Sequence, residues 1–304
     1  MAMPFQVGSP GFETSAVGRA GCKAAAADGE HVPPTNLTRV RSSKSMRLPI
    51  LTDFKAGLKR RYPVAWNTAK TTSRLLRLIP RVYGYEPRTC VLCGYSGRFL
   101  AEIHFPDIFT YVAFCPRCGS APRSRLLKLA VESQGLFRPD TRLLHFAPEA
   151  AVRSYVEPRV RLYRTADLFA DGVDLKLNIE AIEQPERSWD VIICSHVLEH
   201  VDHRKALAEL HRILAPGGRL LALFPVVEAW PTDYEAPEIR TPRDRGLHFG
   251  KDNHLRRFGS SVRAEFKKAG FQLETFSPIG PEVVRYGLIP GETLFIGVRP
   301  DLAP

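Results

Sequence analysis

The sequence predicts an α/β protein whose larger part is a parallel β-sheet with helices between the strands. Short apolar runs alternate with helical segments from about residue 138 onward, which is typical of βαβ units. Hydrophobic residues make up 44% of the 304 residues and charged residues 25%, so the composition excludes disordered, collagen-like and disulfide-scaffold chains. Four of the six cysteines lie between residues 89 and 122, which predicts a small separate element before the sheet.

The positive charge is concentrated in the amino-terminal part of the chain. The formal net charge is +11, and residues 1–89 contain 15 Lys and Arg against 5 Asp and Glu. Residues 90–304 contain 28 Lys and Arg against 27 Asp and Glu, so this part of the chain is almost neutral. A basic region favours nucleic acid or an anionic surface as a partner, but the charge gives no such indication for the predicted sheet. No run approaches the roughly 18 apolar residues of a membrane helix, so no transmembrane segment is predicted.

Residues 1–45 have the composition of a disordered tail. They are rich in Ala, Gly, Ser, Thr and Pro and show no apolar period, so they cannot bury enough apolar surface to offset the cost of ordering. The alternative is a misassigned start, with Met46 as the true first residue. The segment has no hydrophobic secretory core, and we therefore expect a cytoplasmic protein.

Residues 46–88 are predicted to form a basic helical leader that Pro63 interrupts. Its apolar side, which includes Leu75, Leu76 and Ile79, is surrounded by lysine and arginine. Such faces are common on ordinary helices, so we favour a solvated cap on the domain. Peripheral membrane contact or nucleic-acid binding by residues 47–88 stays open as the alternative.

The segment 89–125 carries two CxxCG motifs, with Cys90 and Cys93 in the first and Cys115 and Cys118 in the second. Two residues between cysteines let one tight turn present both sulfurs to a tetrahedral ion, and the following glycine permits a left-handed backbone. Four protein ligands leave no open position, so we expect a structural zinc ion in a zinc-ribbon-like clip. Two disulfides or four unpaired thiols are the alternatives, and the lack of a secretory signal disfavours the disulfides.

Two arginines follow the second cysteine motif. Arg123 and Arg125 either contact an anionic substrate or form ion pairs where the clip joins the next domain. The sequence favours the two interpretations equally.

Residues 126–304 contain the predicted sheet domain. Asp167 ends its second strand, 20 residues after Ala147, where a nucleotide-binding βαβ unit uses an acid to bind ribose hydroxyls. Gly217 and Gly218 are expected to end the helix before the fifth strand. The apolar runs predict strands at 141–146, 161–167, 173–178, 189–195 and 219–225, with helices at 150–155, 196–200 and 204–214.

The stretch WDVIICSHVLEHVDHRKALAELHRILAPGGRLLALFP, residues 189–225, resembles the region from strand four to strand five of class I S-adenosylmethionine-dependent methyltransferases, specifically the type 11 methyltransferase domain family. The weaker resemblance from about residue 140 to 298 is to a bacterial subgroup with a cysteine-motif front end. It implies a doubly wound, Rossmann-like sheet of seven strands whose last hairpin, from 270–274 and 293–298, is antiparallel. It also implies methyl transfer from S-adenosylmethionine to an acceptor that the sequence does not identify.

The resemblance also implies which residues bind the cofactor and the acceptor. His196, at the end of the fourth strand, is the candidate catalytic residue, and Asp167 is the candidate ribose ligand. The sequence departs from the family in two places. The loop after the first strand has no glycine, and Asn178 stands where the family often has Asp near the adenine amine. Glu149 is a candidate for holding the ammonium group. The expected cofactor contacts are Phe146, Ala147, Pro148, Glu149, Asp167, Leu168, Asn178, Ile179, Ser195 and His196, and the acceptor candidates are Tyr234, His248, Asp252, His254 and Arg256.

Other functions compete with a small-molecule methyltransferase. His196, Glu199 and His200 match H-x-x-E-H, the zinc motif of inverted metallopeptidases, because two histidines four residues apart share one helix face. The motif follows a strand directly, which the methyltransferase resemblance explains and a peptidase does not, so Glu199 and His200 are expected to stabilise the helix start. An RNA methyltransferase remains a second alternative. A non-catalytic zinc-ribbon binding module on a degenerate methyltransferase fold is the third.

Overall fold

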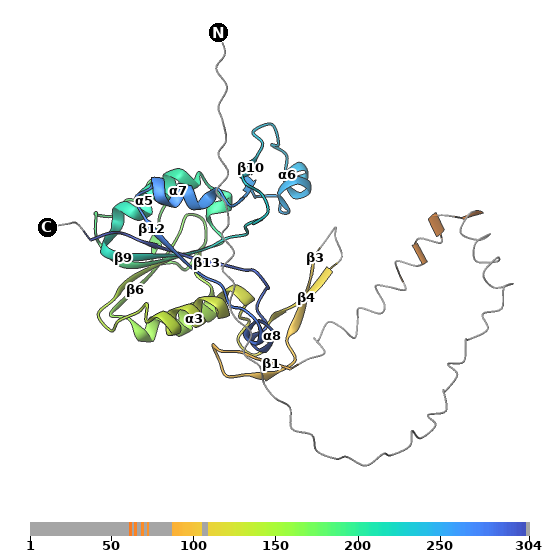
Figure 1. Ribbon diagram of the computed structural model, residues 1–304, viewed down its shortest axis with the longest axis horizontal. Helices are drawn as coiled ribbons and strands as arrows, with labels where there is room; N and C mark the ends of the chain where they lie inside the picture. The colour runs from red at the N-terminus through yellow and green to blue at the C-terminus, as the bar shows by residue number, and fades with distance from the viewer. Residues whose placement is uncertain are drawn as a thin grey trace, which may run out of the picture. The chain divides into compact units, whose positions relative to one another are not determined.

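The computed structural model describes residues 87–104 and 109–301, together with isolated positions between 61 and 72 (Figure 1). The predicted tail 1–45 and most of the predicted leader 46–88 therefore lie outside the described residues. In the part of the chain that the structure describes, no helix is long and apolar enough to cross a membrane.

A seven-stranded sheet forms the centre of the molecule, as the sequence predicts. Its order is β12-β13-β9-β8-β5-β6-β7, and β13 runs antiparallel to both of its neighbours while the other six strands run in one direction. The chain begins in the middle at β5, winds outward to one edge and then to the other, which is the doubly wound arrangement. The strands are β5 (Arg142–Phe146), β6 (Leu162–Asp167), β7 (Leu175–Lys176), β8 (Trp189–Ser195), β9 (Leu214–Leu223), β12 (Gln272–Phe276) and β13 (Leu294–Val298).

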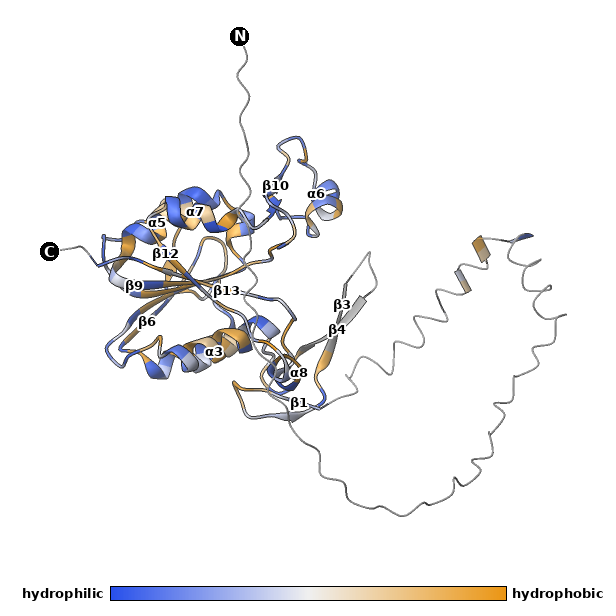
Figure 2. Ribbon diagram, viewed as in Figure 1, coloured by the Kyte–Doolittle hydropathy of each residue, from blue (hydrophilic) through white to orange (hydrophobic). Residues whose placement is uncertain are grey.

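Helices cover both faces of the sheet. Along each strand successive side chains point to opposite faces, so Leu143 and Leu144 belong to two different hydrophobic cores. α5 and α7 pack on the Leu144 side, and α3 and α4 on the Leu143 side (Figure 1). Figure 2 colours the central strands mostly as hydrophobic, whereas the helices carry both colours. The helices are α3 (Pro122–Gln134), α4 (Ala150–Val156), α5 (His203–Ile213), α6 (Pro242–Phe249), α7 (Val262–Lys268) and α8 (Pro281–Tyr286), with 3₁₀ turns η2 (Glu157–Arg159) and η3 (Leu198–His200).

Two expectations for the segment between β8 and β9 are wrong. Residues 196–200 do not form an α-helix, because His196 takes a left-handed backbone (φ 55°) and only the short turn η3 follows. α5 does not end on a glycine cap, since its C-cap is Leu214 in an extended conformation. The guanidinium of Arg299 supplies the cap instead, donating from Nη1 to the carbonyl oxygens of His211, Arg212 and Leu214 at 2.8, 2.8 and 2.6 Å.

The cysteine-containing element precedes the sheet and belongs to the same compact unit, Val64–Pro304. It consists of the hairpins β1 (Arg88–Thr89) with β2 (Ser96–Gly97) and β3 (Leu100–His104) with β4 (Phe109–Phe114). α3 begins directly after it and runs across residue 125, where the predicted clip ends, so one helix carries the chain from the clip to the sheet. The boundaries 89–125 and 126–304 stay predictions.

Arg125 joins the clip to the rest of the protein. Its side chain is completely buried, and its guanidinium stacks over the ring of Phe99 at 4.8 Å from the centroid. It donates to the carbonyl oxygens of Ser120, Tyr286 (2.7 Å) and Gly287 (2.6 Å), so it ties the second cysteine motif to the end of α8. Of the two interpretations of Arg125, the junction is therefore the one the contacts support. Burial lowers the pKa of the guanidinium to about 10, which still leaves it charged.

We expect Arg125→Ala to lower the free energy of unfolding by about 3–5 kcal/mol, because it removes a buried cation and leaves buried carbonyl groups without a donor. Arg138→Ala, at an exposed position soon after the same helix, is the control and should change stability by less than about 0.5 kcal/mol. Urea denaturation followed by circular dichroism measures both, and equal effects of the two substitutions would contradict this role of Arg125.

Candidate functional site

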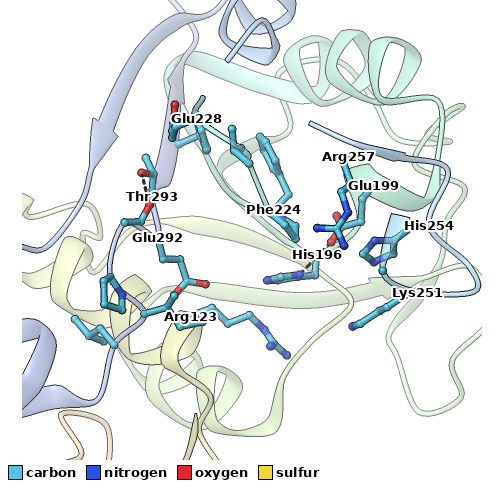
Figure 3. Close-up of a pocket in the computed structure, with 18 of the residues that line it drawn as sticks. Arg123, His196, Glu199, Phe224, Glu228, Lys251, His254, Arg257, Glu292 and Thr293 are labelled. Carbon is cyan, nitrogen blue, oxygen red and sulfur yellow. Dashed lines mark hydrogen bonds and ion pairs between the residues drawn. The ribbon is translucent and has the colours of Figure 1, made fainter. Parts of the chain in front are cut away.

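A cavity of about 1080 Å³ opens where β8 and β9 end. This is the edge at which open α/β sheets bind ligands, because the loops after parallel strands diverge there. Phe224, Phe249, Leu288 and Phe295 contribute apolar surface to its wall. Figure 3 shows charged side chains from several loops around the same space. They are Arg88, Arg123, Glu199, Glu228, Lys251, Arg256, Arg257 and Glu292.

His196 lines this cavity, as expected for the candidate catalytic residue. Its backbone N–H donates to the carbonyl oxygen of Leu223 at 2.7 Å, which fixes the end of β8 against the end of β9. Its Nδ1 lies 3.0 Å from Oε1 of Glu199. Glu199 is 1% exposed, and the neighbouring His196 holds the pKa of that carboxyl below its ordinary value despite its burial. Glu199 thus lies in the cavity beside His196.

Glu292 lies in the loop before β13 and was not among the residues that the sequence singled out. It lines the cavity, and its Oε2 atom is buried without a hydrogen-bond partner among the described residues. Burial raises the pKa of its carboxyl to about 7, although His196, Arg123 and Arg125 favour the charged form. A carboxyl that titrates near neutrality inside a cavity can accept or donate a proton there.

The loop after β5 keeps an unusual backbone without glycine. Ala147 has φ 49°, a left-handed conformation that favours glycine, and its N–H donates to the carbonyl oxygen of Ala166 at 3.0 Å. Glu149 accepts hydrogen bonds from Nε of Arg123 (2.5 Å) and from the hydroxyl of Ser124. Both carboxylate oxygens are therefore engaged, and Arg123 takes part in the junction as well as lining the cavity.

The remaining expected cofactor residues lie along the same edge of the sheet. Asp167 ends β6, and its Oδ1 accepts from the backbone N–H groups of Phe169 and Ala170, both at 2.8 Å. Oδ1 of Asn178 accepts from the N–H of Glu180 at 3.0 Å, which leaves one lone pair for a further donor. Leu168 is exposed and Ile179 buried. Ser195 is buried, and its hydroxyl has no partner among the described residues.

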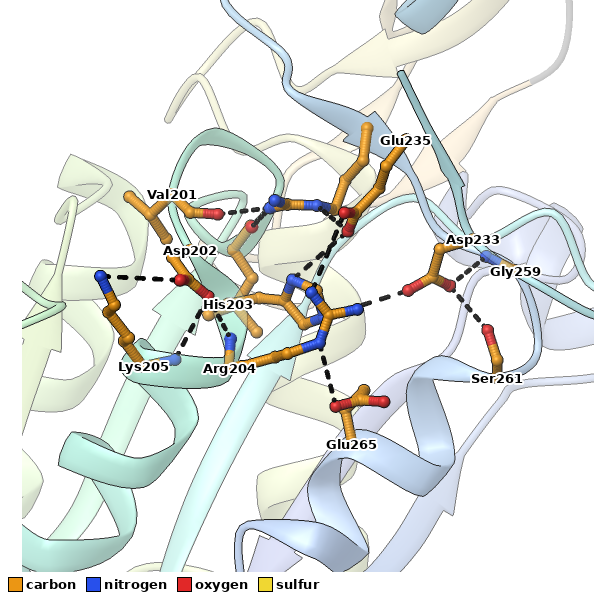
Figure 4. A network of polar contacts seen from close by, with 12 residues as sticks. Val201, Asp202, His203, Arg204, Lys205, Asp233, Glu235, Gly259, Ser261 and Glu265 are labelled. Carbon is orange, nitrogen blue, oxygen red and sulfur yellow. Dashed lines mark hydrogen bonds and ion pairs between the residues drawn. The ribbon is translucent and has the colours of Figure 1, made fainter. Parts of the chain in front are cut away.

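Of the acceptor candidates after β9, His254 and Arg256 line the cavity. The hydroxyl of Tyr234 forms a hydrogen bond with Nδ1 of His248 at 2.7 Å. Asp252 is exposed. Arg256 is held by Oε1 of Glu235 (2.6 Å) and by the carbonyl oxygen of Leu198 (3.2 Å). Figure 4 shows the surrounding polar network, which fixes the hairpin β10 (Tyr234–Glu235) with β11 (Arg256–Arg257) against the segment after β8.

The four predicted zinc ligands converge. The Sγ atoms of Cys90 and Cys118 are 3.6 Å apart, as are those of Cys93 and Cys115, and all four lie within 4.8 Å of one another. Both motifs form the same turn, in which the N–H of the following glycine donates to the carbonyl oxygen of the first cysteine, at 2.9 and 2.8 Å. Four sulfurs bound tetrahedrally to zinc at about 2.3 Å would be about 3.8 Å apart, so the spacing fits such an ion.

Comparison with known proteins points to one family. A model of the methyltransferase domain matches residues 68–275. The ubiquinone/menaquinone biosynthesis C-methyltransferase UbiE of Escherichia coli is 34% identical over 94 residues, which are 29% of this chain and 38% of that protein. The solved structure of YcgJ of Bacillus subtilis is similar at a TM-score of 0.42, with 18% identity, and the match covers 58% of this chain and 99% of that one. The structure of the 1,6-didemethyltoxoflavin-N1-methyltransferase of Burkholderia thailandensis is similar at a TM-score of 0.41, with 16% identity, and the match covers 60% of this chain and 79% of that one.

We expect Glu292→Gln to stabilise the protein at pH 8 by about 1–3 kcal/mol and to have little effect at pH 4.5. The folded protein binds a proton at Glu292 that the unfolded chain releases near pH 4.5, so wild-type stability falls as pH rises from about 4.5 to about 7. Glu274→Gln removes an exposed carboxylate from β12 and is the control. Urea denaturation at several pH values measures the difference, and a pH-independent effect of Glu292→Gln would contradict the assignment.

Proposed function

The chain belongs to the methyltransferase domain family, and we propose that it is an S-adenosylmethionine-dependent methyltransferase whose acceptor is a small, partly apolar molecule that carries an acidic group. The cavity at the ends of β8 and β9 carries this proposal. Its volume of about 1080 Å³ is of the size that holds small-molecule ligands, and its wall is rich in apolar and aromatic side chains. UbiE, by its name, methylates carbon in quinone biosynthesis, which is in line with an acceptor of this kind.

Two of the cations that line the cavity, Lys251 and Arg257, support an acidic acceptor. Two others are already paired with acids, Arg123 with Glu149 and Arg256 with Glu235. Lys251 and Arg257 also line the cavity, but neither side chain has an acidic partner among the described residues. Arg257 is partly buried, and a partly buried cation without an acidic partner favours a ligand with a carboxylate or another acidic group.

For the cofactor we propose the edge formed by the ends of β5, β6 and β8. Asp167 would accept hydrogen bonds from the ribose hydroxyls, Asn178 and Ile179 would lie beside the adenine, and Ser195 and His196 would face the sulfonium. The left-handed backbone at Ala147 gives the loop the shape that glycine gives elsewhere, so Phe146, Ala147 and Pro148 would border the methionine portion. Glu149 would act through Arg123 rather than by binding the ammonium group alone.

The chemistry needs little from the protein beyond alignment. The bound sulfonium supplies an already activated methyl group, and the chain orients the acceptor behind it and excludes water. Where the acceptor must lose a proton, Glu292 is placed to take it, because its pKa of about 7 lets the charged form exist at neutral pH while it remains a usable base. His196, which also lines the cavity, would orient the acceptor or the cofactor.

We also propose that Cys90, Cys93, Cys115 and Cys118 hold a structural zinc ion. The matched turns and the sulfur spacing support it, and the buried cation of Arg125 would offset the negative charge of four thiolates around one divalent ion. Thiolate sites persist where thiols stay reduced, which supports a cytoplasmic location. The clip 89–125 would then stabilise the front of the methyltransferase domain 126–304.

Asp167→Ala is expected to weaken S-adenosylmethionine binding by about 10- to 100-fold, because one or two hydrogen bonds to a charged acceptor are lost. Asp171→Ala removes a fully exposed acid from the same loop and should leave binding unchanged. Isothermal titration calorimetry measures both. No binding by the folded wild type would favour a non-catalytic module, and equal loss in the two variants would contradict the role of Asp167.

The acceptor class is tested with labelled S-adenosylmethionine and fractionated extracts. Label should enter acidic small molecules, and Arg257→Ala should raise KM for the labelled acceptor by about tenfold, whereas Arg243→Ala, on the exposed side of α6, should not. Label in RNA instead would overturn the small-molecule assignment and favour the RNA methyltransferase alternative.

A further inference from the structure

We propose that Glu199, His200 and His254 form a second metal site, which binds one divalent first-row transition ion at the edge of the cavity that Glu199 and His254 line. One carboxylate and two imidazole ligand atoms of these residues lie within 4.8 Å of one another. Bonds of about 2.0–2.2 Å to a shared ion need ligand atoms about 3–4 Å apart, so modest side-chain rotation would complete the site. Figure 3 shows Glu199 and His254 on the same side of the cavity.

The two histidines are oriented as metal ligands usually are. Nδ1 of His200 lies 3.1 Å from the carbonyl oxygen of Asn253, and Nδ1 of His254 lies 3.2 Å from that of Phe249. A carbonyl oxygen can only accept, so each Nδ1 carries the proton and each Nε2 keeps its lone pair. This pattern fixes the tautomer that leaves Nε2 free to bind an ion. The Nε2 atom of His254 is buried and has no partner among the described residues.

The carboxylate of Glu199 completes the set. The residue is 1% exposed, and its Oε2 atom has no hydrogen-bond partner among the described residues. Nδ1 of His196 lies 3.0 Å from Oε1 and so would orient the carboxylate while Oε2 meets the ion. Leaving a buried acceptor unpaired is unfavourable, and a bound cation would remove that cost.

The backbone holds the two halves of the site together. The N–H of Leu255 donates to the carbonyl oxygen of Glu199 at 2.9 Å, which sets His254 beside η3, and the rings of His200 and His254 meet edge to face at 4.8 Å between centroids. Residues 54 positions apart in the chain therefore keep a fixed separation.

A neighbouring cluster of a histidine and two acids is less suited to bind a metal ion. His203, Asp233 and Glu235 also lie close together, but their carboxylates already have donors. Asp233 accepts from the N–H of Gly259 and the hydroxyl of Ser261, both at 2.9 Å, and Glu235 accepts from Arg256 (Figure 4). Glu235 is therefore already paired with the cations of Arg256 and Arg204, whereas Glu199 has no lysine or arginine partner among the described residues.

Two imidazoles and one carboxylate favour Zn²⁺, Co²⁺, Fe²⁺ or Mn²⁺ over Mg²⁺ and Ca²⁺, which prefer oxygen ligands. Three protein ligands leave open positions, so an acidic acceptor could bind the ion directly, and the ion would lower the pKa of an acceptor hydroxyl. This metal site goes beyond the proposed function, and its occupancy can be measured without donor or acceptor.

The test uses Co²⁺ added to the full-length, zinc-loaded protein. Binding at the proposed site gives weak visible absorption without an intense thiolate-to-cobalt band, because no sulfur is involved. We expect one Co²⁺ per chain, with affinity at least about tenfold lower in Glu199→Gln and His254→Ala. His248→Ala removes a nearby histidine outside the cluster and should leave the affinity unchanged. Binding of S-adenosylhomocysteine, measured on every variant, reports that the fold and the cofactor site are intact.

The outcomes separate the two proposals. Wild-type protein that binds S-adenosylhomocysteine but no Co²⁺, or Glu199→Gln protein that binds Co²⁺ as wild type does, overturns the metal site and leaves the methyltransferase assignment standing. Co²⁺ binding that depends on Glu199 and His254 supports the metal site whatever the acceptor proves to be.

Discussion

One buried cation joins the cysteine-containing clip to the sheet domain in the part of the chain that the structure describes. The guanidinium of Arg125 lies at the start of α3, contacts the ring of Phe99 and donates to carbonyl oxygens of the second cysteine motif and of the α8 terminus. A desolvated charge is tolerated only where its donors are matched, so these three segments must meet in one geometry. Because α8 leads into the loop that carries Glu292, the same residue also fixes one wall of the cavity. Stability of the clip and shape of the site are therefore coupled through Arg125.

Two residues at strand ends along the ligand-binding edge have backbone conformations that non-glycine residues rarely adopt. Ala147 after β5 and His196 after β8 both have φ near 50°, which costs roughly 1–2 kcal/mol at a non-glycine residue. Each is held by a backbone hydrogen bond to a neighbouring strand, from Ala147 to Ala166 and from His196 to Leu223. Strain of this kind persists where the surrounding structure determines it, and here it turns His196 toward the cavity rather than into a helix. The first loop thus contains a left-handed residue at Ala147 although it has no glycine.

Most of the sheet could be predicted from the sequence because its signal is local. Apolar runs, turn residues and the acid at Asp167 placed the strands, and the block from residue 189 to 225 identified the fold family. The spacing of the cysteines likewise predicted their convergence. The composition of the site could not be predicted in the same way. Glu292 acquires its raised pKa only from burial by distant segments, and His254 meets Glu199 only through a hairpin pairing that no local pattern encodes. The H-x-x-E-H motif is visible in the sequence, but nothing in it indicates that His254 lies beside Glu199 and His200.

The position of β13 has a consequence for how the protein is made. This strand is the last of the described strands, yet it lies inside the sheet, between β9 and β12. During synthesis the five parallel strands can pair before residue 294 has left the ribosome, but β9 then presents an open edge with unpaired backbone groups. A product that ends before residue 292 would expose that edge and also lack Glu292, the apolar wall at Phe295 and the Arg299 cap of α5. Closure of the sheet and of the cavity wall therefore both depend on residues 292–299.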